Sequence, residues 1–127
     1  MALIERFEDI QGWQEARKLV KMIYALCAKD TLSKDYGMRD QIRRAAVSVM
    51  ANIAEGFDCE SDIEFARFLG IARRSAVEVQ SLLYAALDVG YITQQEFDSY
   101  YEQARKTKAL VGGFKRSLIK KHTIHNS

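Results

Sequence analysis

The sequence contains no proline among its 127 residues, where an average usage of about 5% would place roughly six. Proline is common in the tight turns of β-sandwiches and interrupts helices, so its absence favours long helices. No apolar run approaches the roughly 18 residues that a membrane-spanning helix needs. The opening segment MALIERFEDI carries acids and lacks the apolar stretch of a secretory signal. We therefore expect neither a membrane span nor an export signal.

Cysteine and histidine are also scarce, which limits the chemistry available to the chain. The two cysteines are expected to be free thiols in a reducing compartment, the cytoplasm. Cys27 falls on the apolar face of a predicted helix, and Cys59 lies in a predicted loop between two acids, a setting that does not favour a nucleophilic thiolate. His122 and His125 are the only histidines, too few for a stable metal site. The sequence thus predicts no catalytic residue, metal or cofactor.

Apolar residues recur at alternating gaps of three and four in four segments, the spacing of amphipathic helices. These segments cover about residues 11–29, 38–55, 61–88 and 93–119, with turn residues between the first two. Short connections between four helices predict an all-α, antiparallel up-and-down four-helix bundle. We expect one domain over residues 1–119 and a basic, frayed tail over residues 120–127.

Several residues are expected to mark helix ends. Asp9 is a candidate N-cap for the first helix, and Gly56 and Gly90 are candidates for the left-handed residue after the second and third. Capping boxes are predicted at 61–64 and 93–96, where a hydroxyl residue is followed three positions later by glutamate. In the fourth segment, the pair Gly112 and Gly113 predicts a kink or a close approach of another backbone.

The second helix has a stretch without charge, residues 45–54 (AAVSVMANIA). A helix that is apolar nearly all round is buried on more than one side. The stretch therefore predicts that a partner subunit covers part of this helix in a homo-oligomer.

A row of polar residues follows one face of the second helix, and a comparable row follows the third. The members of this polar row are Gln41, Arg44, Ser48, Asn52 and Glu55, with Arg74 and Glu78 opposite. Unpaired polar groups in an apolar setting are unfavourable, so a hydrogen-bond and ion-pair network that fixes helix register or subunit pairing is the first interpretation. A groove for a ligand or nucleic acid is the alternative.

Charge is distributed unevenly along the chain. Residues 105–127 carry seven cations and no acid, whereas the first 104 residues carry twelve basic and seventeen acidic side chains. Such a basic end predicts weak, sequence-tolerant binding of RNA or single-stranded nucleic acid. A solvated helix end, where cations suit the negative pole of the helix dipole, is the alternative. Tyr101 is the one aromatic residue of the fourth helix expected to be free for stacking. The cations expected to bind phosphates are Lys108, Lys115, Arg116, Lys120 and Lys121.

The sequence resembles the four-helix-bundle proteins encoded in intervening sequences of bacterial 23S rRNA genes. The most specific match is the run from Gln41 to Gly56, and further similarity lies in residues 7–16, 36–40 and 64–88. The sequence departs from the family pattern at Met50, where proline is usual, at Arg74, where glycine is common, and at Gln80, where an acid is common. The resemblance implies a non-enzymatic, cytoplasmic bundle that assembles as a homopentamer. It also implies an architecture similar to the accessory proteins of diversity-generating retroelements, basic barrels that bind nucleic acid and a reverse transcriptase.

Two functional hypotheses follow from these features. The first is a homo-oligomeric scaffold whose basic surface contacts RNA or an RNA-associated protein, such as a reverse transcriptase. The second is a purely structural or protein-interaction module without affinity for nucleic acid. Neither hypothesis involves a membrane.

Overall fold

The structure is a computed structural model that describes residues 4–126, with side chains described for residues 4–121. The all-α prediction is confirmed, because the described residues contain helices and no strand. A short 3-10 helix, η1, precedes five α-helices. The elements are η1 (Phe7–Asp9), α1 (Gln11–Cys27), α2 (Asp30–Lys34), α3 (Tyr36–Phe57), α4 (Asp62–Asp88) and α5 (Gln94–Asn126).

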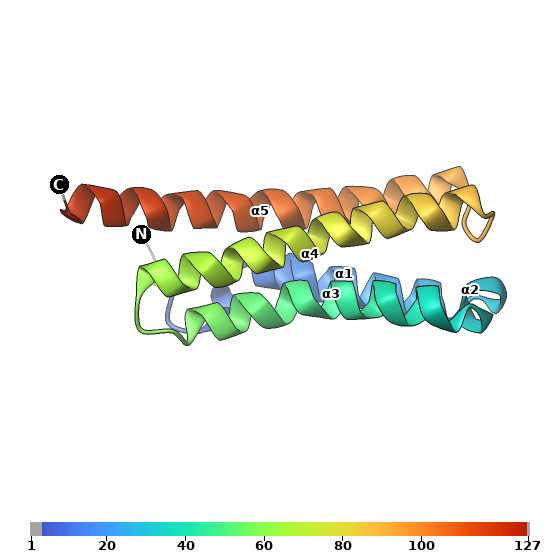
Figure 1. The fold of residues 1–127 in the computed structure, drawn as a ribbon, viewed down its shortest axis with the longest axis horizontal. Helices are drawn as coiled ribbons and strands as arrows, with labels where there is room; N and C mark the ends of the chain where they lie inside the picture. Colours follow the sequence, from blue (N-terminus) through green and yellow to red (C-terminus); the bar gives the residue numbers. More distant parts are fainter. Residues whose placement is uncertain (1–3, 127) are drawn as a thin grey trace.

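The four long helices pack as a bundle. α3 packs between α1 and α4, and α5 contacts both α4 and α1. Figure 1 shows the chain reversing direction between α1 and α3, between α3 and α4, and again between α4 and α5. The last part of α5 extends past the loop that joins α3 to α4 (Figure 1). No helix of residues 4–126 has the length and apolar content needed to cross a membrane.

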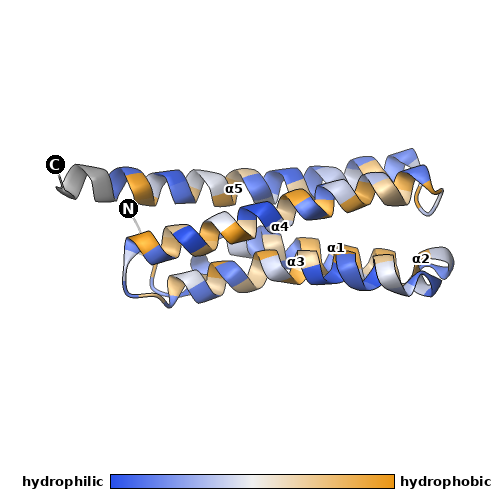
Figure 2. Ribbon diagram, in the orientation of Figure 1, coloured by the Kyte–Doolittle hydropathy of each residue, from blue (hydrophilic) through white to orange (hydrophobic). Residues whose placement is uncertain are grey.

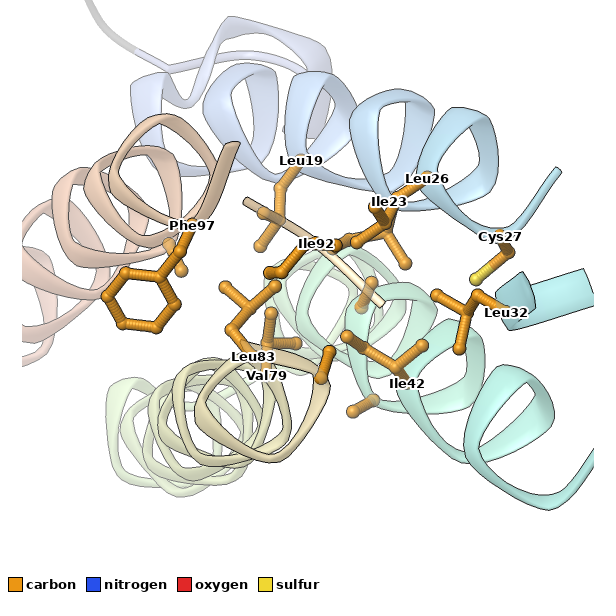
Figure 3. Packing of buried hydrophobic residues seen from close by; sticks show 14 residues of the cluster. Leu19, Ile23, Leu26, Cys27, Leu32, Ile42, Val79, Leu83, Ile92 and Phe97 are labelled. Atoms are coloured by element: carbon orange, nitrogen blue, oxygen red, sulfur yellow. The ribbon is translucent and has the colours of Figure 1, made fainter. Parts of the chain in front are cut away.

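Each long helix alternates apolar and polar positions, as Figure 2 shows, and the apolar positions meet in two buried clusters. In the cluster near α2, side chains from α1, α3, α4 and α5 converge on one centre (Figure 3). Leu19, Ile23, Leu26, Ile42 and Leu83 are fully buried there. In the second cluster, Trp13 and Phe65 pack with Val49 and Ile53 of α3 and with Ala72 and Ala76 of α4. Burial of these side chains against one another is the main source of the bundle's stability.

Three of the predicted helix ends are confirmed. Gly90 has a φ of 83°, and its N–H donates to the carbonyl of Leu87 while that of Tyr91 reaches Ala86, as in a Schellman motif. Thr93 and Glu96 form a reciprocal capping box, with distances of 3.1 Å and 2.9 Å. Ser61 Oγ accepts from the Glu64 N–H at 3.1 Å.

Other end predictions are wrong. Asp9 lies inside η1, and the N-cap of α1 is Ile10, whose side chain makes no capping bond. Gly56 lies within α3, which continues to Phe57. The segment predicted as a turn after α1 contains the short helix α2, because the buried Leu32 anchors it to the core.

The glycine pair in α5 marks no close backbone approach. A Cβ added at Gly112 would make only ordinary contacts with Arg116 and Arg73, and one at Gly113 would lie 3.8 Å from Arg116 Nη2. The tight contact of α5 is instead with α1, where a Cβ at Gly12 would lie 3.2 Å from Val111 Cγ2. α5 continues as a helix to Asn126, past the position where fraying was expected to begin.

One chain already covers most of the charge-free stretch in α3. Ala45, Ala46, Val49 and Ile53 are buried, and the remaining residues except Val47 are half-buried. Val47 is 39% exposed. Packing within the chain therefore accounts for most of this stretch without a partner subunit.

Candidate nucleic-acid interface

The outer side of the α4–α5 pair carries the basic residues that the sequence singled out. Lys108 and Lys115 are half-buried between the two helices, and Arg116 is exposed. Lys120 and Lys121 are exposed farther along α5. The structure therefore arranges these five cations along one helix, with the first three beside α4.

Two further cations of the basic end form ion pairs with acidic side chains. Arg105 forms two hydrogen bonds with Glu102, at 2.6 Å and 2.8 Å, which raise the pKa of Arg105 and lower that of Glu102. Lys106 lies 3.0 Å from the buried carboxylate of Glu15 on α1. These two residues are outside the predicted set, so the predicted cations are the ones that remain available for phosphates.

A cavity of about 240 Å³ lies between α4 and α5 at the centre of the basic surface. It is lined by Arg73, Arg105, Lys108, Ala109, Gly112 and Arg116. Its floor is open because Gly112 has no side chain: a Cβ there would lie 3.5 Å from Arg73 Cδ and 3.4 Å from Arg116 Nη1. No acidic side chain is among its lining residues. Such a hollow presents several N–H donors to an anion.

Arg73 is a member of this site that the sequence analysis did not select. It lies on α4 and comes from the acidic part of the chain, so its charge was counted with the body rather than with the basic end. The signal that could have found it is the pairing of α4 with α5, which places Arg73 beside Gly112. Distribution of charge along the sequence alone cannot reveal such a pair.

A second cavity, of about 370 Å³, continues the same surface toward the start of α4. Ile63 and Ile119 line it and are 58% and 47% exposed. Lys115 lies at its edge, with Nζ 3.0 Å from the position that a Cβ would take at Gly70. This end of the surface is therefore more apolar than the basic centre.

Of the two tyrosines that contact each other between α4 and α5, the exposed one is Tyr84 of α4 and not Tyr101. Tyr101 is half-buried and stacked on Phe97, with ring centroids 5.2 Å apart. Tyr84 is 51% exposed, and its ring lies 4.7 Å from Phe97 and 5.7 Å from Tyr101. The neighbouring rings pack against Tyr84, and about half of the residue remains exposed.

Only two residues of the polar row on α3, Ser48 and Asn52, form a hydrogen-bond network. Ser48 Oγ shares a 2.8 Å hydrogen bond with Ser75 Oγ of α4, and Asn52 Nδ2 donates to Ser48 O and Oγ at 2.8 Å and 3.0 Å. Ser75, which was not among the predicted members, is therefore the α4 partner. The other predicted members are exposed, and within residues 4–121 no side-chain hydrogen bond or ion pair joins them to the serines. These members are Gln41, Arg44, Glu55, Arg74 and Glu78.

The cysteines and histidines add no site among the described residues. Cys27 is buried, as predicted, and burial raises the pKa of its thiol. Cys59 is half-buried rather than exposed. No group of three or more metal-ligating side chains occurs within the part of the chain that the structure describes. The side chains of His122 and His125 lie outside that part.

Comparison with known proteins places this bundle in a family. Residues 8–113 match the family model described as the 23S rRNA-intervening sequence protein. The chain belongs to this family. The crystal structure of a protein of unknown function from the S23 ribosomal protein family of Bacteroides thetaiotaomicron superimposes with a TM-score of 0.75. It is 23% identical, and the similarity covers 82% of this chain and 97% of that one. No curated protein matches the chain.

The solved structure has the same fold as this chain over 82% of its length. At 23% identity the likeness concerns the fold alone. The family match spans α1 to the middle of α5 and so includes Arg73, Lys108 and Gly112. It ends before Lys115, Arg116, Lys120 and Lys121, so most of the predicted cations lie outside the matched region.

Proposed function

We propose that this intervening-sequence protein is a non-enzymatic, homo-oligomeric scaffold of the cytoplasm that contacts RNA through the basic side of α5. Its building unit in this proposal is an antiparallel up-and-down four-helix bundle. The observation that carries the proposal is the basic hollow between α4 and α5, where Arg73, Lys108 and Arg116 meet without an acid among the lining residues. Phosphate groups are the most abundant anions that such a surface would meet on RNA.

The family supports RNA as the partner without identifying it. Its description ties these proteins to intervening sequences of 23S rRNA, which is a genetic association. The positive charge of the C-terminal part is also compatible with RNA, which is negatively charged. This part carries seven cations and no acid, whereas the first 104 residues have five more acidic than basic side chains. Binding that depends on this local charge is expected to be weak and tolerant of sequence.

A titration of labelled single-stranded RNA at about 50 mM salt tests this proposal, because phosphate contacts are strong at low ionic strength. The test variant changes Lys115, Arg116, Lys120 and Lys121 to Gln. The matched control changes four exposed cations elsewhere to Gln and alters the net charge equally. The control residues are Arg6, Arg17, Lys21 and Lys34. The proposal expects binding that the test variant loses and the control retains.

Two outcomes of that titration contradict RNA contact through α5. One is the absence of binding by the unchanged protein at low salt. The other is an equal loss in the test and control variants, which would indicate an effect of net charge rather than of this surface.

Assembly into a homo-oligomer, proposed here as a pentamer, is supported by an apolar patch on the α1–α3 face. Tyr24 and Val47 are 42% and 39% exposed and line a shallow cavity with Asp40, Arg43 and Arg44. Arg43 lies over the Tyr24 ring, with its Cζ 4.3 Å from the centroid. Exposed apolar groups beside charges of both signs are typical of a surface that pairs with a protein.

A protein-interaction module without nucleic-acid affinity is the second candidate, favoured by the apolar cavity at Ile63 and Ile119. In that case the apolar cavity at Ile63 and Ile119 would bind an apolar segment of a protein, for example of a reverse transcriptase or another RNA-associated protein. Failure of RNA to bind at low salt would favour this candidate over the first.

A further inference from the structure

We propose that the groove between α4 and α5 holds a short single-stranded segment of nucleic acid, with a phosphate in the Arg73–Lys108–Arg116 hollow and a base stacked on Tyr84. This inference rests on the proposed function and assigns it a specific site. It adds two α4 residues, Tyr84 and Arg73, to a surface that the sequence placed on α5 alone.

The two helices present matching rows of residues to the groove. On α4 the row includes Gly70, Arg73 and Tyr84, at helical spacings of three and eleven residues. On α5 the row includes Tyr101, Lys108 and Gly112. The contacts that join the rows are those of Tyr84 with Tyr101 and of Arg73 with Gly112. Each of these contacts joins one residue of the α4 row to one residue of the α5 row.

The length of this side suits a segment of a few nucleotides. Eleven residues separate Arg73 from Tyr84, which at 1.5 Å per residue corresponds to roughly 16 Å along α4. A single strand can place a phosphate at one end of that distance and a base at the other. An extended strand is needed, since a base within a duplex is covered by its neighbours and cannot stack on a protein ring.

The hollow has room for a phosphate group and is lined by side chains that can bind one. Its volume is about 240 Å³, and two of its lining residues are arginines that come from different helices, Arg73 and Arg116. A guanidinium donates two parallel hydrogen bonds to phosphate oxygens, which fixes the position of the anion as well as its charge. Arg105 also lines the hollow, but its bonds with Glu102 occupy it. Arg73, Lys108 and Arg116 therefore carry the proposed contact.

Tyr84 provides the aromatic surface that a basic patch alone lacks. Its ring is half exposed, although Phe97 and Tyr101 hold it from one side. Every base has a π-face, so stacking on this ring adds affinity without strong base preference. The combination of one phosphate site and one stacking site predicts preference for single strands over duplexes.

The test is binding of the full-length protein to a single-stranded RNA of about 12 nucleotides that carries 2-aminopurine at one position. Variants Tyr84→Ala and Arg73→Gln are compared with Tyr36→Ala, another exposed tyrosine, and Lys21→Gln, another exposed cation. A Tyr84→Phe variant keeps the ring and removes only the hydroxyl. Circular dichroism melting establishes that each variant is folded before binding is measured.

We expect the unchanged protein to quench 2-aminopurine fluorescence, as stacking on tyrosine requires. Tyr84→Ala and Arg73→Gln should each raise the Kd by about tenfold, whereas the two control variants and Tyr84→Phe should change it by less than about twofold. An RNA duplex of the same length should compete poorly with the single strand.

The inference is overturned if Tyr84→Ala and Arg73→Gln bind as tightly as their controls while the α5 variant of Lys115, Arg116, Lys120 and Lys121 still loses affinity. That result would support RNA binding through α5 and show that Arg73 and Tyr84 do not take part in it. Equal competition by the duplex would also overturn it. If the unchanged protein binds no RNA, the proposed function itself fails together with this inference.

Discussion

Gly56 of α3 lies directly against Phe65 of α4, so closely that a Cβ at residue 56 would be 2.8 Å from Phe65 Cδ1 and 2.8 Å from Phe68 Cβ. Gly56 is buried inside the helix rather than at its end. The absence of a side chain therefore lets α3 and α4 approach each other where the loop joins them.

Gly56→Ala should destabilise the bundle. Alanine favours a helix over glycine by about 1 kcal/mol, but overpacking of this kind typically costs about 1–3 kcal/mol. The contact atom on Phe68 is close to its backbone and cannot move aside easily. We expect a net decrease of about 1–2 kcal/mol in the free energy of unfolding, measured by urea denaturation.

Gly113→Ala is the matched control and should have the opposite sign. Residue 113 is also helical, and an added Cβ would meet only Arg116 Nη2 at 3.8 Å. The variant should gain about 0.5–1 kcal/mol from the lower entropy of the unfolded chain. Equal effects at the two positions would contradict the close α3–α4 approach.

The hydroxyl pair Ser48 and Ser75 should couple in a double-mutant cycle. Ser48→Ala leaves Ser75, which is 8% exposed, without its α4–α3 hydrogen bond and should lower stability by about 1–2 kcal/mol. Adding Ser75→Ala should recover part of this loss, because no buried hydroxyl is then left unpaired. Gln41→Ala, at an exposed position of the same helix, should change stability by less than about 0.5 kcal/mol. Additive effects of the two serine variants would contradict the pairing.

Glu15 should make the bundle more stable at neutral than at acid pH. Its carboxylate is largely buried, and hydrogen bonds from Lys106 and then Lys18 and Gln103 hold its pKa below the usual value, against the desolvation that raises it. Because the pKa is lower in the folded chain, the stabilisation is present above the pKa of the unfolded chain and is lost as the pH falls through that of the folded chain. Glu15→Gln should therefore lower stability by about 1 kcal/mol at neutral pH.

The Glu15 prediction is checked by urea denaturation from neutral to acid pH. The difference between the unchanged protein and Glu15→Gln should shrink as the pH falls, whereas Glu60→Gln, at an exposed loop position, should show little difference at any pH. A Glu15→Gln effect that is the same at both ends of the pH range would show that the carboxylate charge is not what stabilises the α1–α5 contact.

Val47→Glu should weaken assembly without unfolding the helix bundle. Light scattering of the unchanged protein at low micromolar concentration should give several times the chain mass of 14.5 kDa. A charge at Val47 should shift this mass downward, because it replaces an exposed apolar side chain of the patch with a hydrated one. Val89→Glu, at a position 60% exposed at the end of α4, should leave the mass unchanged. A monomer for the unchanged protein would contradict the proposed assembly.

The helices could be predicted from sequence because local patterns determine them. The apolar spacing of residues such as Leu69, Ala76 and Leu83 depends only on helical geometry, and the capping box at Thr93 and Glu96 is complete within four residues. Gly56 could not be assigned correctly, because a buried glycine and a terminal glycine look the same without the neighbouring helix. The helix α2 was missed because its five residues have turn composition and only Leu32 packs into the core.

The candidate site was only partly predictable, because some of its residues come together only through the packing of two helices. The cations of α5 stand out because no acid interrupts them. Arg73 and Tyr84 belong to the site through the pairing of α4 with α5, which brings residues about forty and seventeen positions apart in the chain next to each other. The ion pair of Lys106 could not be read from the sequence either, since its partner Glu15 lies on α1.

The salt dependence of RNA affinity tests the central claim most directly. Each phosphate contact with a single strand contributes about −0.7 to the slope of log affinity against log salt concentration. The account predicts a steep slope for the unchanged protein, and a slope shallower by up to about 3 when Lys115, Arg116, Lys120 and Lys121 are changed to Gln. Binding with the same slope in both proteins, or no binding at about 50 mM salt, would contradict the claim that this surface of α5 contacts RNA.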